Sequence, residues 1–183
     1  MRVTESPPEL ANLLFARKAH LIAIDGAHGS GKSTLAKYIA GNLGASLIEV
    51  DQFLRRNQDA YLPNLDYEAI ARKVDPQRPC ILEGICIRQV AATAGLTPDV
   101  NVYVKRTARW GWADEDRLVF EGSVEGHLER MKQDALRFFD AGEQPRLGLW
   151  EEVIPYHAQY RPQETCDFVY LRIDTGRLAL SKS

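Results

Sequence analysis

The sequence predicts an α/β fold in which helices cover both faces of a five-stranded parallel sheet. Five short apolar runs alternate along the 183 residues with segments of helical character, as they do in βαβ units. A glycine-rich stretch, Gly26-Ala27-His28-Gly29-Ser30-Gly31-Lys32-Ser33, lies directly between the first of these runs and a helical segment. Apolar residues make up 45% of the chain and charged residues 26%, which fits a single domain over residues 1–183.

The first element of the chain is expected to be a helix from Ser6 to about Lys18. Ser6 can cap its first turn, Pro7 suits that turn, and Glu9 completes a capping box. An apolar stripe then follows at helical spacing, so we expect this helix to pack on the sheet and to carry no chemistry.

The remaining elements follow in alternation. Strands are expected at the apolar runs 20–25, 46–50, 79–83, 100–104 and 167–173. Further helices are expected at 33–43, 65–74, 85–94, 106–112, 124–140 and 147–160. Gly44 and Gly95 end two of these helices, and Pro155 kinks or divides the last one.

The glycine-rich stretch has the pattern Gly-x-x-x-x-Gly-Lys-Ser of a phosphate-binding loop. Its glycines let backbone N–H groups turn inward around nucleotide phosphates, Lys32 reaches the β- and γ-phosphates, and the Ser33 hydroxyl faces Mg²⁺. The alternative is a glycine-rich turn with an exposed lysine, which the preceding strand and the following helix disfavour. The nucleotide-binding residues are expected to be Gly26, Ala27, His28, Gly29, Ser30, Gly31, Lys32, Ser33 and Thr34.

Composition and charge argue against several classes of protein. The formal net charge is −2, and the isoelectric point of about 6.1 does not favour nucleic-acid binding. No apolar run approaches the roughly 18 residues of a membrane span, and the N-terminus has no secretory leader pattern. Cys80, Cys86 and Cys166 lack metal-site spacing and are expected to be free thiols, which predicts a cytoplasmic protein.

Polar residues follow the expected strands at the points where the strands end. Ligands of parallel sheets bind beyond the carboxyl ends of the strands, and this rule selects Gly26, Asp51, Glu83 and the pair Lys105-Arg106. We therefore expect these residues to meet in one cleft.

Asp51 and Glu83 are the two candidate acidic residues of that cleft. A carboxylate at Asp51 suits a general base that accepts the proton of an attacking hydroxyl, and the alternative is a helix cap. Glu83, directly after an apolar strand, suits a residue that holds Mg²⁺, and the alternative is a solvated loop carboxylate. No Asn-Lys-x-Asp segment for reading guanine is present. A small enzyme that moves phosphate to a small molecule remains.

The ordered set of motifs resembles the uridine kinase family of P-loop kinases, which includes nicotinamide riboside kinase relatives. The resemblance covers most of the chain. It rests on Ile24-Asp25-Gly26 before the loop, Asp51-Gln52-Phe53, Asn64-Leu65-Asp66, Leu82-Glu83-Gly84-Ile85, and Ile154-Pro155-Tyr156-His157 through Tyr160, Pro162 and Asp167.

This resemblance implies a P-loop NTPase fold with a small lid, at about residues 106–123. It implies that Asp51 is the catalytic base, that Ser33 and Glu83 lie on the side of the site that holds Mg²⁺, and that Asp66 is a ligand of substrate hydroxyls. The residues expected to contact the substrate are Asp51, Phe53, Asp66, Glu83 and Arg88.

The chain departs from the family pattern in two places. The family's long insertion with a hairpin, which helps to read the nucleobase, has no room between residues 74 and 79. The lid region carries Arg106, Arg109 and Arg117 among acidic residues instead of the family's arginine-rich segment. Arg106 and Arg109 are expected to share a helix face and to stabilise the moving phosphoryl group, and surface salt bridging is the alternative.

The function expected from all of this is transfer of the γ-phosphate of ATP, with Mg²⁺, to a hydroxyl of a small molecule. A nucleoside is the first expectation for the acceptor, followed by another riboside or metabolite. A regulatory P-loop ATPase that hydrolyses nucleotide, and a nucleotide-binding module without turnover, are the alternatives. No nucleic-acid or membrane partner is expected, and the protein is expected to be a monomer or homodimer.

Overall fold

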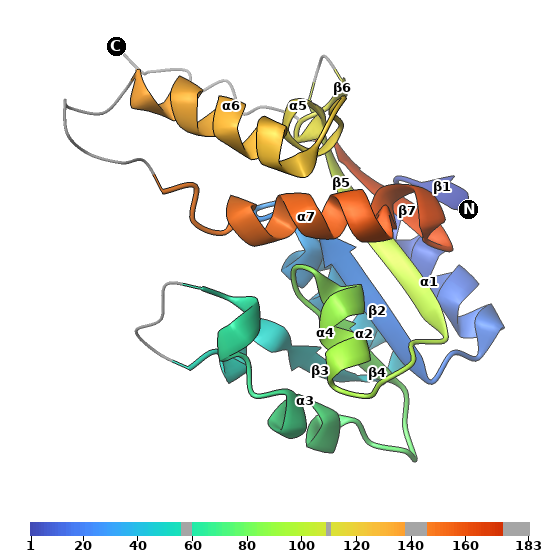
Figure 1. The fold of residues 1–183 in the computed structure, drawn as a ribbon. Coiled ribbons are helices and arrows are strands. Elements are labelled where there is room, and N and C mark those ends of the chain that lie inside the picture. The colour runs from blue at the N-terminus through green and yellow to red at the C-terminus, as the bar shows by residue number, and fades with distance from the viewer. Residues whose placement is uncertain (56–59, 109–110, 138–145, 174–183) are drawn as a thin grey trace, which may run out of the picture.

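The computed structural model describes residues 1–55, 60–108, 111–137 and 146–173, and its central element is one twisted sheet (Figure 1). Its strand order is β1-β7-β5-β2-β4-β3, and all these pairings are parallel. A short strand, β6, pairs antiparallel with the end of β5. The strands are β1 (Arg2–Thr4), β2 (Leu21–Gly26), β3 (Ser46–Glu49), β4 (Cys80–Glu83), β5 (Val100–Ala108), β6 (Gly111–Trp112) and β7 (Phe168–Ile173).

Helices cover both faces of this sheet. They are α1 (Pro7–Arg17), α2 (Lys32–Leu43), α3 (Tyr67–Lys73), α4 (Ile87–Thr93), α5 (Glu115–Leu118), α6 (Val124–Leu136), α7 (Trp150–Tyr160) and α8 (Pro162–Thr165). Two 3₁₀ turns, η1 (Val50–Phe53) and η2 (Leu62–Asn64), follow β3.

Alternate side chains of β2 enter two different cores. Ile22 and Ile24 pack with α1 and α2, whereas Leu21 and Ala23 pack in the core formed with α4 and α7. This alternation is the period of two expected of a strand buried on both faces. The predicted α/β fold with a parallel sheet is therefore confirmed.

The predicted number of five strands is wrong, because β1 and β6 also belong to the sheet. β1 has three residues, too few to show a periodicity, and it is recruited by parallel pairing of Arg2 with Phe168. β6 exists because the chain turns back after β5, and Thr107 pairs with Trp112.

The helix predicted at residues 106–112 is also wrong. β5 continues as a strand to Ala108, and Arg106 pairs with Arg172 of β7. Lys105 and Arg106 therefore lie within the strand and not beyond its end. Pairing with β7, a strand more than 60 residues away in the chain, makes this segment a strand. Helix propensity is a local property and does not detect such a pairing.

Several predicted helix ends shift for identifiable reasons. Ser6 caps α1 as predicted, with its hydroxyl 3.3 Å from the Glu9 amide, but the Glu9 carboxylate binds Thr4 and Arg2 instead of completing a capping box. Gly44 ends α2 in the left-handed conformation, as predicted. α7 begins at Trp150 and passes through Pro155 without dividing, so its predicted start at 147 is too early.

Candidate functional site

The phosphate-binding loop joins the end of β2 to the first turn of α2. Gly31 precedes α2 with φ +95°, a conformation that side chains other than glycine rarely adopt. At Gly26 an added Cβ would lie 2.8 Å from the Val104 carbonyl oxygen and 2.7 Å from the Ser30 hydroxyl. Both glycines are therefore required by the local geometry, and the predicted strand–loop–helix arrangement is present.

Lys32 is a buried cation whose charge also acts on the buried carboxylates of Asp25 and Glu83. The residue is 8% exposed, and the one hydrogen bond its ammonium makes to a described residue is a 3.4 Å bond to the Ala27 carbonyl. The Ser30 hydroxyl is buried and has no partner among the described atoms. A buried ammonium and an unpaired hydroxyl beside a helix N-terminus fit an anionic ligand such as the phosphates of a nucleotide.

Glu83 meets the phosphate loop from the next strand. β2 and β4 pair with Ile24 opposite Glu83, which brings a Glu83 carboxylate oxygen 2.9 Å from the Ser33 hydroxyl. Burial raises the pKa of Glu83, the nearby carboxylates of Asp51 and Glu49 add to that effect, and Ser33 and Lys32 oppose it. The alternative of a solvated loop carboxylate is excluded, because Glu83 is 4% exposed.

The pair Ser33 and Glu83 fits the protein's share of a magnesium site. Mg²⁺ keeps several waters and needs only one or two protein oxygens beside substrate phosphates. Within the described ranges, no group of three or more His, Cys, Asp or Glu side chains could hold a metal ion by itself. A divalent cation here would thus depend on phosphate oxygens for the rest of its shell.

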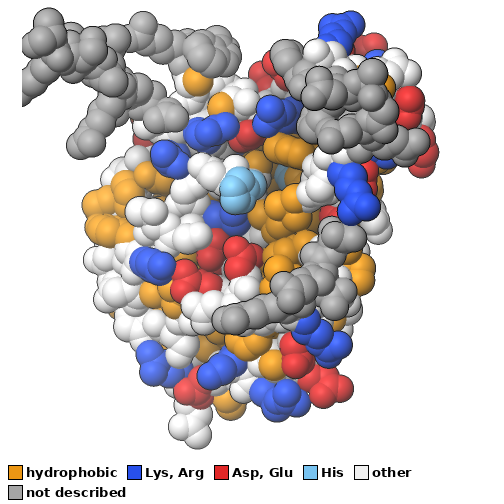
Figure 2. Space-filling view, turned by 90° about the vertical axis from the view of Figure 1, so that its left-hand side faces the viewer, with side chains coloured by type: hydrophobic (Ala, Val, Ile, Leu, Met, Phe, Trp, Pro, Cys, Tyr) orange, Lys and Arg blue, Asp and Glu red, His pale blue; other side chains and the backbone are white. Residues whose placement is uncertain are grey.

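Asp51 is exposed on η1 and does not serve as a helix cap. Its carboxylate oxygen Oδ1 accepts a 2.7 Å hydrogen bond from the Tyr61 hydroxyl. Its charge acts on Glu83, so the two carboxylates lie in one electrostatic neighbourhood. Figure 2 shows acidic side chains gathered in the middle of one face, with hydrophobic side chains beside them and basic side chains above.

The other residues expected to contact substrate have structural partners. Asp66 is the N-cap of α3, with Oδ1 2.9 Å from the Ala69 amide, and its own amide donates to the Phe53 carbonyl. Phe53 packs partly buried against the core. Arg88 points its guanidinium at the Thr165 hydroxyl, 2.7 Å away at the end of α8. In the described residues, Arg88 makes no hydrogen bond to the acidic group around Asp51.

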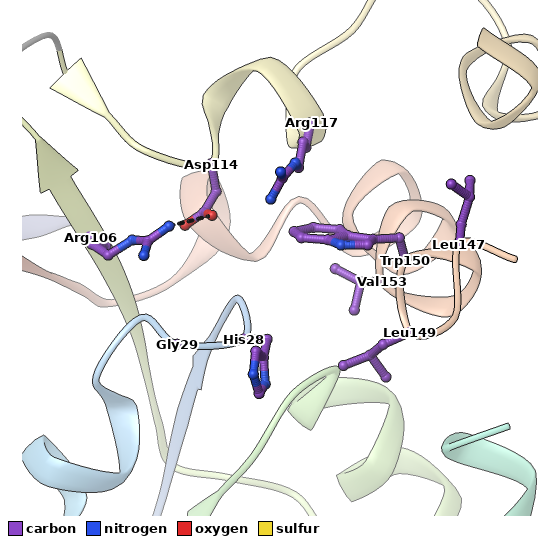
Figure 3. Close-up of a pocket in the computed structure, with 9 residues that line it drawn as sticks. All are labelled: His28, Gly29, Arg106, Asp114, Arg117, Leu147, Leu149, Trp150 and Val153. Carbon is purple, nitrogen blue, oxygen red and sulfur yellow. Dashed lines mark hydrogen bonds and ion pairs between the residues drawn. The ribbon is translucent and has the colours of Figure 1, made fainter. Parts of the chain in front are cut away.

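A cavity of about 540 Å³ opens between the phosphate loop, the segment after β5, and α7. Figure 3 shows Arg106 and Arg117 approaching it from the lid side and Trp150 with Val153 from α7. Its lining residues are His28, Gly29, Arg106, Asp114, Arg117, Leu147, Leu149, Trp150 and Val153.

The lid arginines differ in their partners. Arg106 forms an ion pair with the buried Asp114 at 3.4 Å, and its Nε is buried without a partner. Arg117 lies 5.0 Å over the Trp150 ring. Arg109 lies outside the described residues. The predicted helix face shared by Arg106 and Arg109 does not exist, because Arg106 is in β5.

A buried polar network supports the phosphate loop from behind. Asp25, near the end of β2, accepts hydrogen bonds from the Gly26 amide and from the Tyr156 hydroxyl. Burial raises the pKa of Asp25. Next to this pair, the His157 ring bonds the Tyr103 hydroxyl at 2.9 Å and the Val153 carbonyl at 2.8 Å. Burial lowers the pKa of His157, which favours the neutral ring.

The sequence reasoning missed Tyr61, Glu152, Asp114 and Arg172. Arg172 crosses the phosphate loop, where it donates a 3.1 Å hydrogen bond to the Gly29 carbonyl and leaves no room for a Cβ at Gly31. The rule that selects polar residues at strand ends could have found Arg172, because it lies one residue before the end of β7. No local pattern marks the other three. The partners of Glu152 are about 90 residues away, and those of Tyr61 and Asp114 are 10 and 8 residues away, at spacings that no helix or strand period covers.

A second cavity, of about 400 Å³, lies on the other side of the loop between α2 and β7. It is lined by Pro7, Gly31, Thr34, Leu35, Tyr38, Tyr170 and Arg172. Two tyrosines and an arginine beside the loop suit a flat, partly polar group such as a nucleotide base.

Two further expectations concern the whole chain. The three cysteines are buried and free, as predicted. None of the helices in the described part of the chain is long and apolar enough to cross a membrane.

Comparison with solved structures shows a likeness to small-molecule kinases. A possible uridine kinase from Bacillus stearothermophilus matches with a TM-score of 0.52 and 13% identity, over 90% of this chain and 96% of that chain. A sugar kinase from Janibacter sp. HTCC2649 has a TM-score of 0.39 and 16% identity, over 84% of each chain. A gluconokinase from Sinorhizobium meliloti 1021 has a TM-score of 0.36 and 17% identity, over 79% of this chain and 92% of that chain.

No family model matches the sequence, and no curated protein does. At these identities the likeness concerns the fold. The match to the possible uridine kinase, with its TM-score of 0.52, supports the predicted α/β fold with a parallel sheet and flanking helices, and assignment to the uridine kinase family stays a prediction.

Proposed function

We propose that the protein is a small-molecule kinase that transfers the γ-phosphate of ATP to a hydroxyl group. The observation that carries the proposal is that β3 ends beside β4, with Glu49 opposite Glu83, so that Asp51, two residues further on, follows the strand end next to the Ser33–Glu83 pair. A nucleotide-binding site requires the loop and its lysine alone. A carboxylate that is exposed next to that site, and that caps no helix, is what transfer to a hydroxyl additionally needs.

The described side chains divide the reaction among them. Asp51 accepts the proton of the attacking hydroxyl while the oxygen of that hydroxyl forms a bond to the γ-phosphorus. The bond between the γ-phosphorus and the oxygen that bridges it to the β-phosphate breaks, which releases ADP. Lys32 and the backbone amides of the loop stabilise the charge on the β- and γ-phosphates. Ser33 and Glu83 would hold Mg²⁺, which when bound neutralises phosphate charge.

The lid residues supply the remaining positive charge. Arg106 and Arg117 line the cavity above His28 and Gly29, where the end of the triphosphate would lie. Arginine at this place stabilises charge on the transferred group. Closure of the segment after β5 would exclude water, which otherwise competes as acceptor.

A nucleoside or another riboside is the proposed acceptor. Asp66 lies next to the Asp51 segment, because its amide bonds the Phe53 carbonyl two residues after Asp51. Residues 74–79 join α3 to β4 and contain no hairpin that could read a nucleobase. We therefore propose an enzyme that binds the sugar diol and tolerates variation in the attached group.

Measurement of ADP release with and without a panel of acceptors tests this function. The panel contains uridine, cytidine, a nicotinamide riboside, their 2′-deoxy forms and simple polyols. We expect a riboside to accelerate ADP release and to yield a phosphorylated product by mass spectrometry. Slow hydrolysis that no acceptor accelerates would instead support a regulatory ATPase.

A further inference from the structure

We propose that Tyr61 is a positioning residue for Asp51, and that Glu152 of α7 holds Tyr61 in place. The inference rests on the proposed kinase function, since Asp51 is the base of that reaction. It adds two residues, one of them 101 positions beyond Asp51, that no motif of the sequence indicates.

The Tyr61 hydroxyl is the hydrogen-bond donor in its contact with Asp51. The 2.7 Å contact joins Tyr61 Oη to Asp51 Oδ1, and Tyr61 is buried although Asp51 is exposed. Burial and the charge of Asp51 raise the pKa of Tyr61, so the hydroxyl keeps its proton. Within the described part of the chain, no other side chain donates a hydrogen bond to the Asp51 carboxylate.

A single donor on one carboxylate oxygen has two consequences. It fixes the rotamer of a side chain that otherwise turns freely in solvent, and it leaves Oδ2 available to accept from the attacking hydroxyl.

Glu152 fixes the backbone that carries Tyr61. Its two carboxylate oxygens each accept a 2.6 Å hydrogen bond, one from the Tyr61 amide and one from the Leu62 amide. These amides stand at the start of η2, where a helical turn supplies no internal acceptor. A charged acceptor on such amides makes a strong contact, and this contact ties η2 to α7.

The same helix also contacts the phosphate loop. Tyr156, four residues after Glu152 on α7, donates to Asp25, and Asp25 accepts from the Gly26 amide. Figure 1 shows α7 running across the molecule. One helix therefore holds both the base and the loop that binds the donor, which keeps their separation constant.

The test compares Tyr61→Phe with Tyr67→Phe. The Tyr67 hydroxyl also bonds this turn, at the Leu62 carbonyl 2.6 Å away, but it does not touch Asp51. With the best acceptor of the panel, we expect Tyr61→Phe to lower kcat about 10- to 100-fold, the range for loss of a hydrogen bond to a charged group. KM for acceptor and ATP should stay near the wild-type values, and Tyr67→Phe should keep kcat.

The split between kcat and KM separates positioning from a merely structural role. A residue that only positions the base acts on the reaction step, so kcat falls while KM for acceptor and ATP stays, whereas a general loosening of the site would raise KM as well. A wild-type kcat in Tyr61→Phe would overturn the proposal.

Glu152→Gln tests the second part, with Glu151→Gln as the matched control. Glu151 is the preceding residue on α7 and pairs with Lys132 on the surface at 3.2 Å. We expect Glu152→Gln to speed hydrogen exchange at the amides of Tyr61 and Leu62 and to lower kcat. Because Glu152 acts through Tyr61, it should lower kcat little further in the Tyr61→Phe background. Fully additive losses would overturn this part.

A thermodynamic cycle on unfolding keeps this inference separate from the proposed function. The free energies of unfolding of Tyr61→Phe, Asp51→Ala and the double variant report the coupling of the two side chains without any substrate, because alanine removes the acceptor of the Tyr61 hydroxyl. Coupling in a protein that phosphorylates no acceptor would overturn the kinase proposal and, with it, the role of Tyr61 in positioning a base. Coupling near zero in an active kinase would overturn the inference and leave the kinase proposal intact.

Discussion

The Ser33 hydroxyl lies 2.9 Å from a carboxylate oxygen of Glu83, 50 residues further along the chain. The two side chains meet because β2 and β4 are neighbours in the sheet and both end at the same edge. The phosphate loop and the acidic strand end thus form one polar site.

Lys32→Ala should weaken ATP binding and lower turnover by at least about 10²-fold, because Lys32 is the buried cation of the loop. Calorimetric titration with ATP–Mg²⁺ and the ADP-release rate measure the two effects. Lys37→Ala, which removes an exposed lysine of α2 that pairs with Glu49, is the matched control. Unchanged affinity and turnover in Lys32→Ala would contradict the phosphate-loop assignment.

Asp51→Asn keeps the shape of the side chain but cannot accept a proton. With the true acceptor we expect turnover to fall about 10²–10⁴-fold, the usual contribution of a positioned base. ATP binding should persist, since Asp51 is not part of the loop. A variant that keeps near-wild-type turnover would show that Asp51 has another role.

Glu83→Gln should raise the Mg²⁺ concentration needed for the half-maximal rate by roughly 10- to 100-fold, the range for residues that support a metal site. The assay is the rate at saturating ATP over a Mg²⁺ titration. Glu49→Gln serves as control, because Glu49 is a nearby carboxylate that pairs with Lys37. If both variants keep the wild-type Mg²⁺ dependence, Glu83 has no metal role.

Asp66→Ser should abolish the preference for ribosides over 2′-deoxyribosides without unfolding α3. A serine still caps the helix, whereas alanine would cost about 1 kcal/mol of stability through loss of the cap. A carboxylate that binds a diol rejects an acceptor without its hydroxyl partner. The kcat/KM ratio of uridine to 2′-deoxyuridine measures this preference, and an unchanged ratio would leave Asp66 as a cap only.

His157→Gln should remove an acid-sensitive contribution to stability. Burial lowers the pKa of His157, so below its ordinary value of 6.5 the unfolded chain binds a proton that the folded chain does not. The wild type should therefore lose stability relative to His157→Gln as the pH falls through 6.5 and below, while above it the difference stays constant. Gln offers a donor for Val153 and an acceptor for Tyr103 without titrating. Urea unfolding at pH 5 to 8 measures the difference, and parallel curves would contradict the prediction.

The phosphate loop, the parallel sheet and most helix positions could be predicted because their signals are local. The loop is one continuous segment whose glycines and lysine act through their own backbone. The run before it is apolar on both faces, and Gly44 ends the following helix as expected. Rules of period and capping act over a few residues, so a sequence displays them directly.

Only the tertiary structure decided the conformation of the segment around Arg106 and the hydrogen bonds that hold Asp51 in place. Residue Arg106 is in a strand because β7 pairs with it from across the chain, against a pattern that favoured a helix. The contacts of Glu152 with the Tyr61 and Leu62 amides join segments 90 and 91 residues apart, and the bond of Tyr61 to Asp51 bridges a loop. Such contacts depend on where the packing of helices and strands brings side chains together. A pattern of a few neighbouring residues does not determine which distant segments meet.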